Sequence, residues 1–208
     1  MKKVILSIVI TMVFAFTMNA QLENKNGVYT EVIQVDLSKK DIYQKVNEWI
    51  AINYKSAQDV VQLNTEDKVI VKGNYIVVMG TKPHRVHNSL SFAIRDNRYK
   101  VDLIANSISV STFEISDAQS EQLIELYSPK KLDEDVYNEI TRENVVANLK
   151  SLGWSDKKIK KKFLDKPYDD YSYYSRYLEN KKNWDKAIES TFQSIKNYIS
   201  QSDSGDDW

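Results

Sequence analysis

The chain has 208 residues, of which 29 are Lys or Arg, 29 are Asp or Glu, two are His and none is Cys. This length suits one domain with an elaboration, and the neutral formal charge argues against a nucleic-acid-binding protein, since such domains are usually strongly basic. Without Cys the chain can form no disulfide, no thiolate zinc site and no cysteine nucleophile, and two His leave little room for His-based catalysis.

The first 20 residues have the pattern of a bacterial secretory signal. Lys2 and Lys3 precede an apolar run from Val4 to Phe16, and Ala20 is a small residue at the expected cleavage point. The run is shorter than the roughly 20 apolar residues that span a bilayer, which favours a signal peptide over a membrane helix or a buried N-terminal helix. We expect cleavage after Ala20 and an exported protein, periplasmic or extracellular. We expect neither a lipid anchor nor a membrane segment in the mature chain.

Residues 28–110 predict one strand, one helix and then four antiparallel strands. The β-branched run VYTEVIQV predicts a strand over 28–35, and Ser38 is a suitable N-cap for an amphipathic helix over 39–54. Asp96 and Asn97 are the expected hairpin turn, because both residue types tolerate positive φ. The later strands are predicted over 60–63, 69–79, 90–94 and 99–103, with a loop at 82–87 around Pro83.

The second half of the chain has helical patterns only. The final helix has the clearest stripe, because apolar side chains recur at spacings of three, four or seven residues from Tyr177 to Tyr198. Such a stripe needs a sheet or another helix to cover it. Helices are predicted over 123–127, 133–152, 156–164 and 171–200, with a linker at 165–170 and an acidic tail at 201–208.

The region from Tyr29 to Val110, read with the final helix, resembles the Bacteroidetes-type DUF4468 family, which is described as having a TBP-like fold. The resemblance is carried by the strand VYTEVIQVD, the helix containing Trp49, the segment VIVKGNYIVVMG and the hairpin LSFAIRDNRYKVDLI. The family is of unknown function, so the resemblance implies a fold and an exported protein but no catalytic residues. Because a fold does not imply a function, DNA binding is not inferred from the name of the fold.

Together these observations predict an α+β fold of order β-α-β-β-β-β-α, with a mostly antiparallel sheet covered on one face by helices. Residues 27–115 and 171–200 are expected to form this TBP-like domain. A helical insertion is expected at 116–170, before the long C-terminal helix.

Tyrosines crowd the start of the predicted final helix. Aromatic rings with hydroxyl groups suit a sugar or a partner interface, but they also suit packing of a helix against a sheet. Both interpretations stay open. The candidate residues for a ligand or partner surface are Tyr168, Tyr171, Tyr174, Tyr177 and Trp184.

A basic run precedes this cluster and forms a second candidate surface. It could meet an anionic lipid or polymer, although its apolar face is too narrow to hold a membrane alone and a solvated helix face is favoured. The patch consists of Lys157, Lys158, Lys160, Lys161 and Lys162.

Metal and catalytic sites are not expected. His84 and His87 could share a metal only with a third ligand and a helical turn, and exposed loop histidines are favoured. Glu139 and Glu143 lie one helical turn apart, but such pairs are common on solvated helices, and acid–base catalysis needs a cleft that shifts their pKa values.

The sequence therefore favours an exported, non-catalytic binding or protein-interaction module without a cofactor. Its partner would be an envelope protein or a small apolar ligand, and not a nucleic acid. One alternative is a carrier that holds a small apolar ligand between the sheet and the final helix, where Tyr177, Trp184, Ile188 and Phe192 could line a cavity. The other alternative is an enzyme with an unrecognised carboxylate mechanism. The oligomeric state is not predicted.

Overall fold

The computed structural model describes residues 22–25, 27–110, 115–128, 131–151, 153–164 and 171–201. The predicted signal peptide, residues 165–170 and all but the first residue of the predicted acidic tail lie outside these ranges. Among the described residues, no helix is long and apolar enough to cross a membrane.

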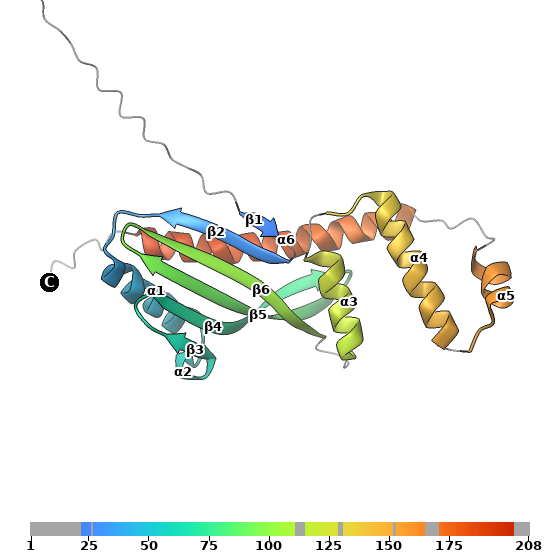
Figure 1. The fold of residues 1–208 in the computed structure, drawn as a ribbon, viewed down its shortest axis with the longest axis horizontal. Coiled ribbons are helices and arrows are strands. Elements are labelled where there is room, and N and C mark those ends of the chain that lie inside the picture. Colours follow the sequence, from blue (N-terminus) through green and yellow to red (C-terminus); the bar gives the residue numbers. More distant parts are fainter. Residues whose placement is uncertain are drawn as a thin grey trace, which may run out of the picture.

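The strands form one antiparallel sheet in the order β1-β2-β6-β5-β4-β3. Figure 1 shows helix α1 and the long helix α6 on the same face of this sheet. The predicted α+β fold with four strands after the first helix is confirmed. The bounds are β1 (Glu23–Lys25), β2 (Val28–Gln34), α1 (Lys39–Asn53), α2 (Ala57–Val60), β3 (Val61–Asn64), β4 (Lys68–Met79), β5 (Lys82–Arg95), β6 (Arg98–Val110) and α6 (Tyr171–Ser200).

The hairpin β5–β6 follows directly from the alternating pattern of its sequence. Leu90, Phe92 and Ile94 are buried beneath the helices, while the residues between them face the open side of the sheet. The turn lies at Asp96 and Asn97 as predicted, and Asn97 has a positive φ of 62°.

The prediction of a loop at 82–87 is wrong, because these residues form the first part of β5. Pro83 pairs with Val78 of β4, and the ladder with β6 begins only at His84. A proline is tolerated where its missing N–H has no partner in the ladder, which is the case at the start of this strand. At one edge of the sheet, β1 is a short strand that the sequence pattern does not predict.

Helices fill the segment between β6 and α6. Helix α3 (Asp117–Tyr127) starts earlier than predicted, because Ser116 and Gln119 form a capping box. It covers the end of β6, where the Ile108 N–H donates to Ser120 Oγ at 2.7 Å. Beyond the sheet lie α4 (Glu134–Ser151), α5 (Asp156–Ile159) and the π-helix η1 (Lys160–Leu164) (Figure 1). Of these, α4 lies beside the first turns of α6, where Tyr137 contacts Tyr174.

The stripe on α6 packs onto the sheet and fills the centre of the molecule. Trp184 is fully buried, and its indole N–H donates to the Tyr29 hydroxyl at 3.0 Å. The Tyr29 hydroxyl in turn donates to the Ser128 carbonyl at 2.7 Å, which ties α6, β2 and the end of α3 together. The other buried side chains of the stripe are Tyr177, Ile188, Phe192, Ile195 and Ile199.

Candidate functional site

The tyrosine cluster joins the inserted helices to α6. Tyr177 is buried, its hydroxyl accepts from the Leu132 N–H at 2.8 Å, and its ring stacks on Tyr137 with centroids 4.6 Å apart. Tyr174 is half-buried and its hydroxyl donates to the Leu132 carbonyl at 3.1 Å. Tyr168 and the side chain of Tyr171 lie outside the described part of the structure.

Burial of the predicted residues limits what they can present to a partner. Tyr177 and Trp184 are 1% and 0% exposed, so neither offers a surface in this structure. Of the candidate residues whose side chains are described, only Tyr174 is partly exposed. The structure thus brings Tyr174, Tyr177 and Trp184 together as packing groups along one helix.

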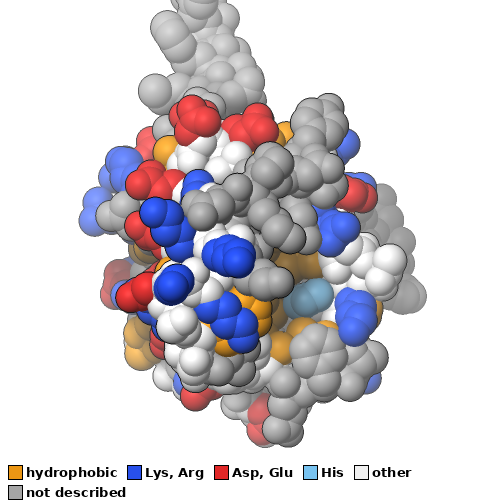
Figure 2. All heavy atoms as spheres, turned by 90° about the vertical axis from the view of Figure 1, so that its right-hand side faces the viewer, with side chains coloured by type: hydrophobic (Ala, Val, Ile, Leu, Met, Phe, Trp, Pro, Cys, Tyr) orange, Lys and Arg blue, Asp and Glu red, His pale blue; other side chains and the backbone are white. Residues whose placement is uncertain are grey.

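The basic patch lies at the far end of the molecule, on α5 and η1. Lys157, Lys158, Lys160 and Lys161 are exposed, and Figure 2 shows Lys and Arg side chains gathered on this end. Ile159 lies between these lysines in the sequence and is buried, so it anchors the segment. Lys158 Nζ lies 3.8 Å from the centre of the Trp154 ring, a cation–π contact. The Lys162 side chain is outside the described residues.

The two histidines are not loop residues, since both lie on β5. They are three residues apart on a strand, so their side chains point to opposite faces of the sheet and do not converge on one ion. His84 Nδ1 lies 3.0 Å from the Lys82 carbonyl, and His87 Nε2 lies 3.2 Å from Ser109 Oγ. Within the described ranges, no group of three His, Cys, Asp or Glu could hold a metal.

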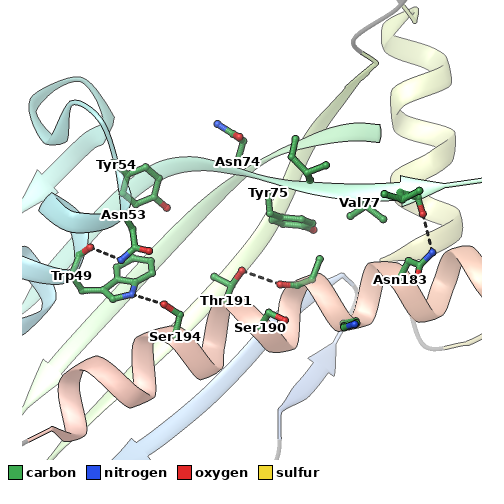
Figure 3. A pocket seen from close by; sticks show the side chains of 14 residues that line it. Trp49, Asn53, Tyr54, Asn74, Tyr75, Val77, Asn183, Ser190, Thr191 and Ser194 are labelled. Carbon is green, nitrogen blue, oxygen red and sulfur yellow. Dashed lines mark hydrogen bonds between the residues drawn. The ribbon is translucent and has the colours of Figure 1, made fainter. Parts of the chain in front are cut away.

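A groove that the sequence pattern does not predict lies along the outer edge of β4, with a volume of about 530 Å³. We call it the edge groove. Its upper wall is the backbone of β4 from Asn74 to Val78, its lower wall is α6 from Asn183 to Ser194, and the end of α1 closes one side with Trp49, Asn53 and Tyr54 (Figure 3).

Hydrogen bonds hold the walls of the edge groove in place. The Trp49 indole N–H donates to Ser194 Oγ at 3.1 Å, which joins α1 to α6 (Figure 3). At the other end, Asn183 Nδ2 donates to the Val78 carbonyl at 3.0 Å and joins α6 to β4. The groove is therefore a built feature with fixed walls rather than a gap between loosely packed elements.

Two tyrosines shape the inner side of the groove. The Tyr54 ring lies over Gly73, where a Cβ would come within 2.8 Å of Tyr54 Cε1, so a glycine is required for this close approach. Burial raises the pKa of Tyr54 to about 12 and also raises that of Tyr75. The Tyr75 hydroxyl is fully buried and has no hydrogen-bond partner among the described residues.

Two sequence signals point to the edge groove in retrospect. Ala187, Ser190, Thr191 and Ser194 are small residues at helical spacing, and they lie on the face of α6 beside the buried stripe. The predicted strand at 69–79 is also much longer than its predicted neighbour at 60–63, so part of its edge has to stay unpaired. Neither signal names a ligand.

Comparison with protein-family models agrees with the resemblance in the sequence. Residues 29–109 match the domain of unknown function (DUF4468) with TBP-like fold. No curated protein matches the chain.

Two solved structures are similar to the chain. A crystal structure of a DUF4468 family protein from Bacteroides ovatus has a TM-score of 0.51 at 12% identity and covers 88% of this chain and 93% of its own. A TBP-like protein from Parabacteroides distasonis has a TM-score of 0.47 at 16% identity and covers 88% of this chain and 99% of its own. At such low identity the first likeness concerns the fold alone. The family resemblance predicted from the sequence is confirmed for residues 29–109, which match DUF4468 with its TBP-like fold.

Proposed function

We propose that the protein is an exported, non-catalytic binding module and that the edge groove is its binding site. The observation that carries this proposal is the groove itself, with walls fixed by hydrogen bonds from α1 and α6. Among the described residues, its lining offers amides, hydroxyls, aromatic rings and one lysine, Lys186, but no carboxylate and no imidazole. Such a set of groups suits recognition better than acid–base catalysis, which needs a titratable acid and base close together.

The carrier alternative receives no support from the residues that suggested it. Tyr177, Trp184, Ile188 and Phe192 pack together in the core and do not line the edge groove. A small apolar ligand in the edge groove would instead lie beside Trp49 and Tyr54.

Export is proposed from the pattern of residues 1–20. When the full chain is expressed in a bacterium with its own leader, we expect the protein in the periplasm or the medium. Its measured mass should correspond to a chain that begins at Gln21. Intact full-length protein in the cytoplasm would contradict this part of the proposal.

Amide chemical-shift mapping tests the site. Three probes of different chemistry are decanoate, maltotriose and a pool of random heptapeptides. At least one should cause saturable shifts that gather on Asn74–Val78 and on Asn183–Ser194. Saturable shifts confined to the open face of the sheet, or none with all three probes, would contradict the proposed site.

A matched pair of variants on α6 serves as the control. Ser190 lines the edge groove, whereas its neighbour Glu189 is exposed and does not line it. Ser190→Leu partly fills the groove, so a ligand should lose at least one hydrogen bond or contact there. The expected loss of affinity is about tenfold or more. Glu189→Leu should leave the binding unchanged.

A further inference from the structure

Strand β4 has an unpaired edge along the groove. Strand β3 pairs with β4 only from Asn64↔Val69 to Val61↔Val71, whereas β5 accompanies β4 to its end at Met79. From Asn74 to Val78 no described strand lies on the outer side of β4. An edge of this kind presents backbone donors and acceptors at the regular spacing of a sheet.

The register of the hairpin shows which backbone groups face outward. Gly80, with a φ of 61°, and Thr81 form a two-residue turn, so Met79 and Lys82 are a hydrogen-bonded pair. Hydrogen-bonded pairs alternate with non-hydrogen-bonded pairs in an antiparallel ladder. The N–H and C=O groups of Asn74, Ile76 and Val78 consequently point away from β5.

Two observed hydrogen bonds agree with this alternation. Asn183 Nδ2 donates to the outward carbonyl of Val78. Lys68 lies an even number of residues before Val78 on β4, so its backbone groups should also point outward, and they exchange two hydrogen bonds with Thr65, the residue after β3. Among the described residues, none bonds to the outward N–H and C=O groups of Asn74 and Ile76. These two residues are ready to pair with a further strand.

We propose that an extended peptide segment of a partner protein binds in the edge groove and adds an antiparallel strand to β4. This inference rests on the proposed function, and it names the kind of partner. The peptide residue opposite Ile76 would exchange two backbone hydrogen bonds with it, and so would the residue opposite Asn74. The small side chains Ala187, Ser190 and Thr191 leave room for this strand above α6.

The lining also determines the side chains of the peptide. Side chains of paired residues share a face, so those between the paired positions point into the groove, beside Val77 and Tyr75. Apolar side chains suit these inward positions. The charged group in the lining is Lys186, one turn from Asn183 and hence near the Val78 end. The peptide should therefore carry an acidic residue at the end beside Val78, which in an antiparallel strand is its N-terminal end.

The probe for the test is a displayed library of random heptapeptides, selected on the mature protein. Selected peptides should alternate apolar residues at the inward positions and carry an N-terminal acidic residue. N-methylation of the amides at the two paired positions should weaken binding about tenfold or more, because each methyl group removes a hydrogen bond to β4. N-methylation of the amide between them should have a much smaller effect.

A proline on the edge strand provides the matching change in the protein. The Ile76 N–H points outward, so Ile76→Pro leaves the ladder with β5 intact and is compatible with an edge strand. It should weaken peptide binding about tenfold or more, whereas Ile76→Val should keep it. If Ile76→Pro does not fold, Asn74→Pro and the N-methylated peptides still decide the outcome.

The possible outcomes separate the inference from the proposed function. If Ser190→Leu blocks peptide binding and Ile76→Pro does not, the groove binds without strand addition, and only the inference is overturned. If neither variant matters, both proposals are overturned. A library that yields no binding peptide overturns the inference. A concentration-dependent dimer that Ile76→Pro abolishes would also overturn it, because the strand would then come from a second copy of this chain.

Discussion

Replacing Trp184 with alanine should lower the free energy of unfolding by about 4 kcal/mol, within the range of large-to-small changes at fully buried aromatic residues. Trp184 is 0% exposed and contacts the rings of Tyr75 and Tyr127, with centroids 6.0 Å away in each case. Its indole N–H donates to the Tyr29 hydroxyl. The alanine variant loses these contacts together and leaves a cavity between α6 and the sheet.

Urea denaturation followed by circular dichroism measures this effect, and two further variants frame it. Trp184→Phe keeps most of the ring volume but loses the indole N–H, so it should cost about 1–2 kcal/mol. Trp154 is only half-buried and packs on Lys158, and Trp154→Ala should cost less than about 1 kcal/mol. Equal losses for Trp184→Ala and Trp154→Ala would contradict a core centred on α6.

The elements that the sequence predicts well are those determined by local chemistry. Asn97 adopts the positive φ that its side chain tolerates, so the β5–β6 turn is found where it is expected. The stripe on α6 is a strong periodic signal, and most of its members are buried. In contrast, Pro83 suggests a loop, because the sequence alone does not show that its missing N–H lies beyond the end of the neighbouring strand.

The candidate site is less predictable for a physical reason. Sequence composition shows that tyrosines gather near residue 174, but burial of Tyr177 depends on Tyr127 and Tyr137, which come from other helices. The edge groove depends on the backbone of β4, and a free backbone edge has no residue type of its own. It arises because the pairing with β3 stops at Val71. Relative strand lengths, rather than motifs, carry the information about this site.

Removing the half-buried lysine that pairs with a buried carboxylate should have the second large effect. Glu31 on β2 is 3% exposed, and its Oε1 accepts from Lys196 Nζ of α6 at 2.9 Å. Burial and the nearby Glu31 charge raise the pKa of Tyr99, so that hydroxyl stays neutral and adds no second negative charge beside Glu31. Lys196→Met leaves an uncompensated buried carboxylate, and we expect a loss of about 3 kcal/mol in the free energy of unfolding.

A double-mutant cycle shows whether this loss comes from the unpaired charge. Glu31→Met together with Lys196→Met removes both charges and should lie within about 1 kcal/mol of the wild type, since apolar replacements of buried pairs are often nearly neutral. Lys182→Met changes an exposed lysine on the same helix and should cost no more than about 0.5 kcal/mol. If the double variant is as unstable as Lys196→Met, the loss reflects packing of the lysine stem and not the charge of Glu31. Recovery in the double variant would show that Lys196 is needed to compensate the buried charge of Glu31, and that apolar side chains can hold α6 to β2 at this point without the pair.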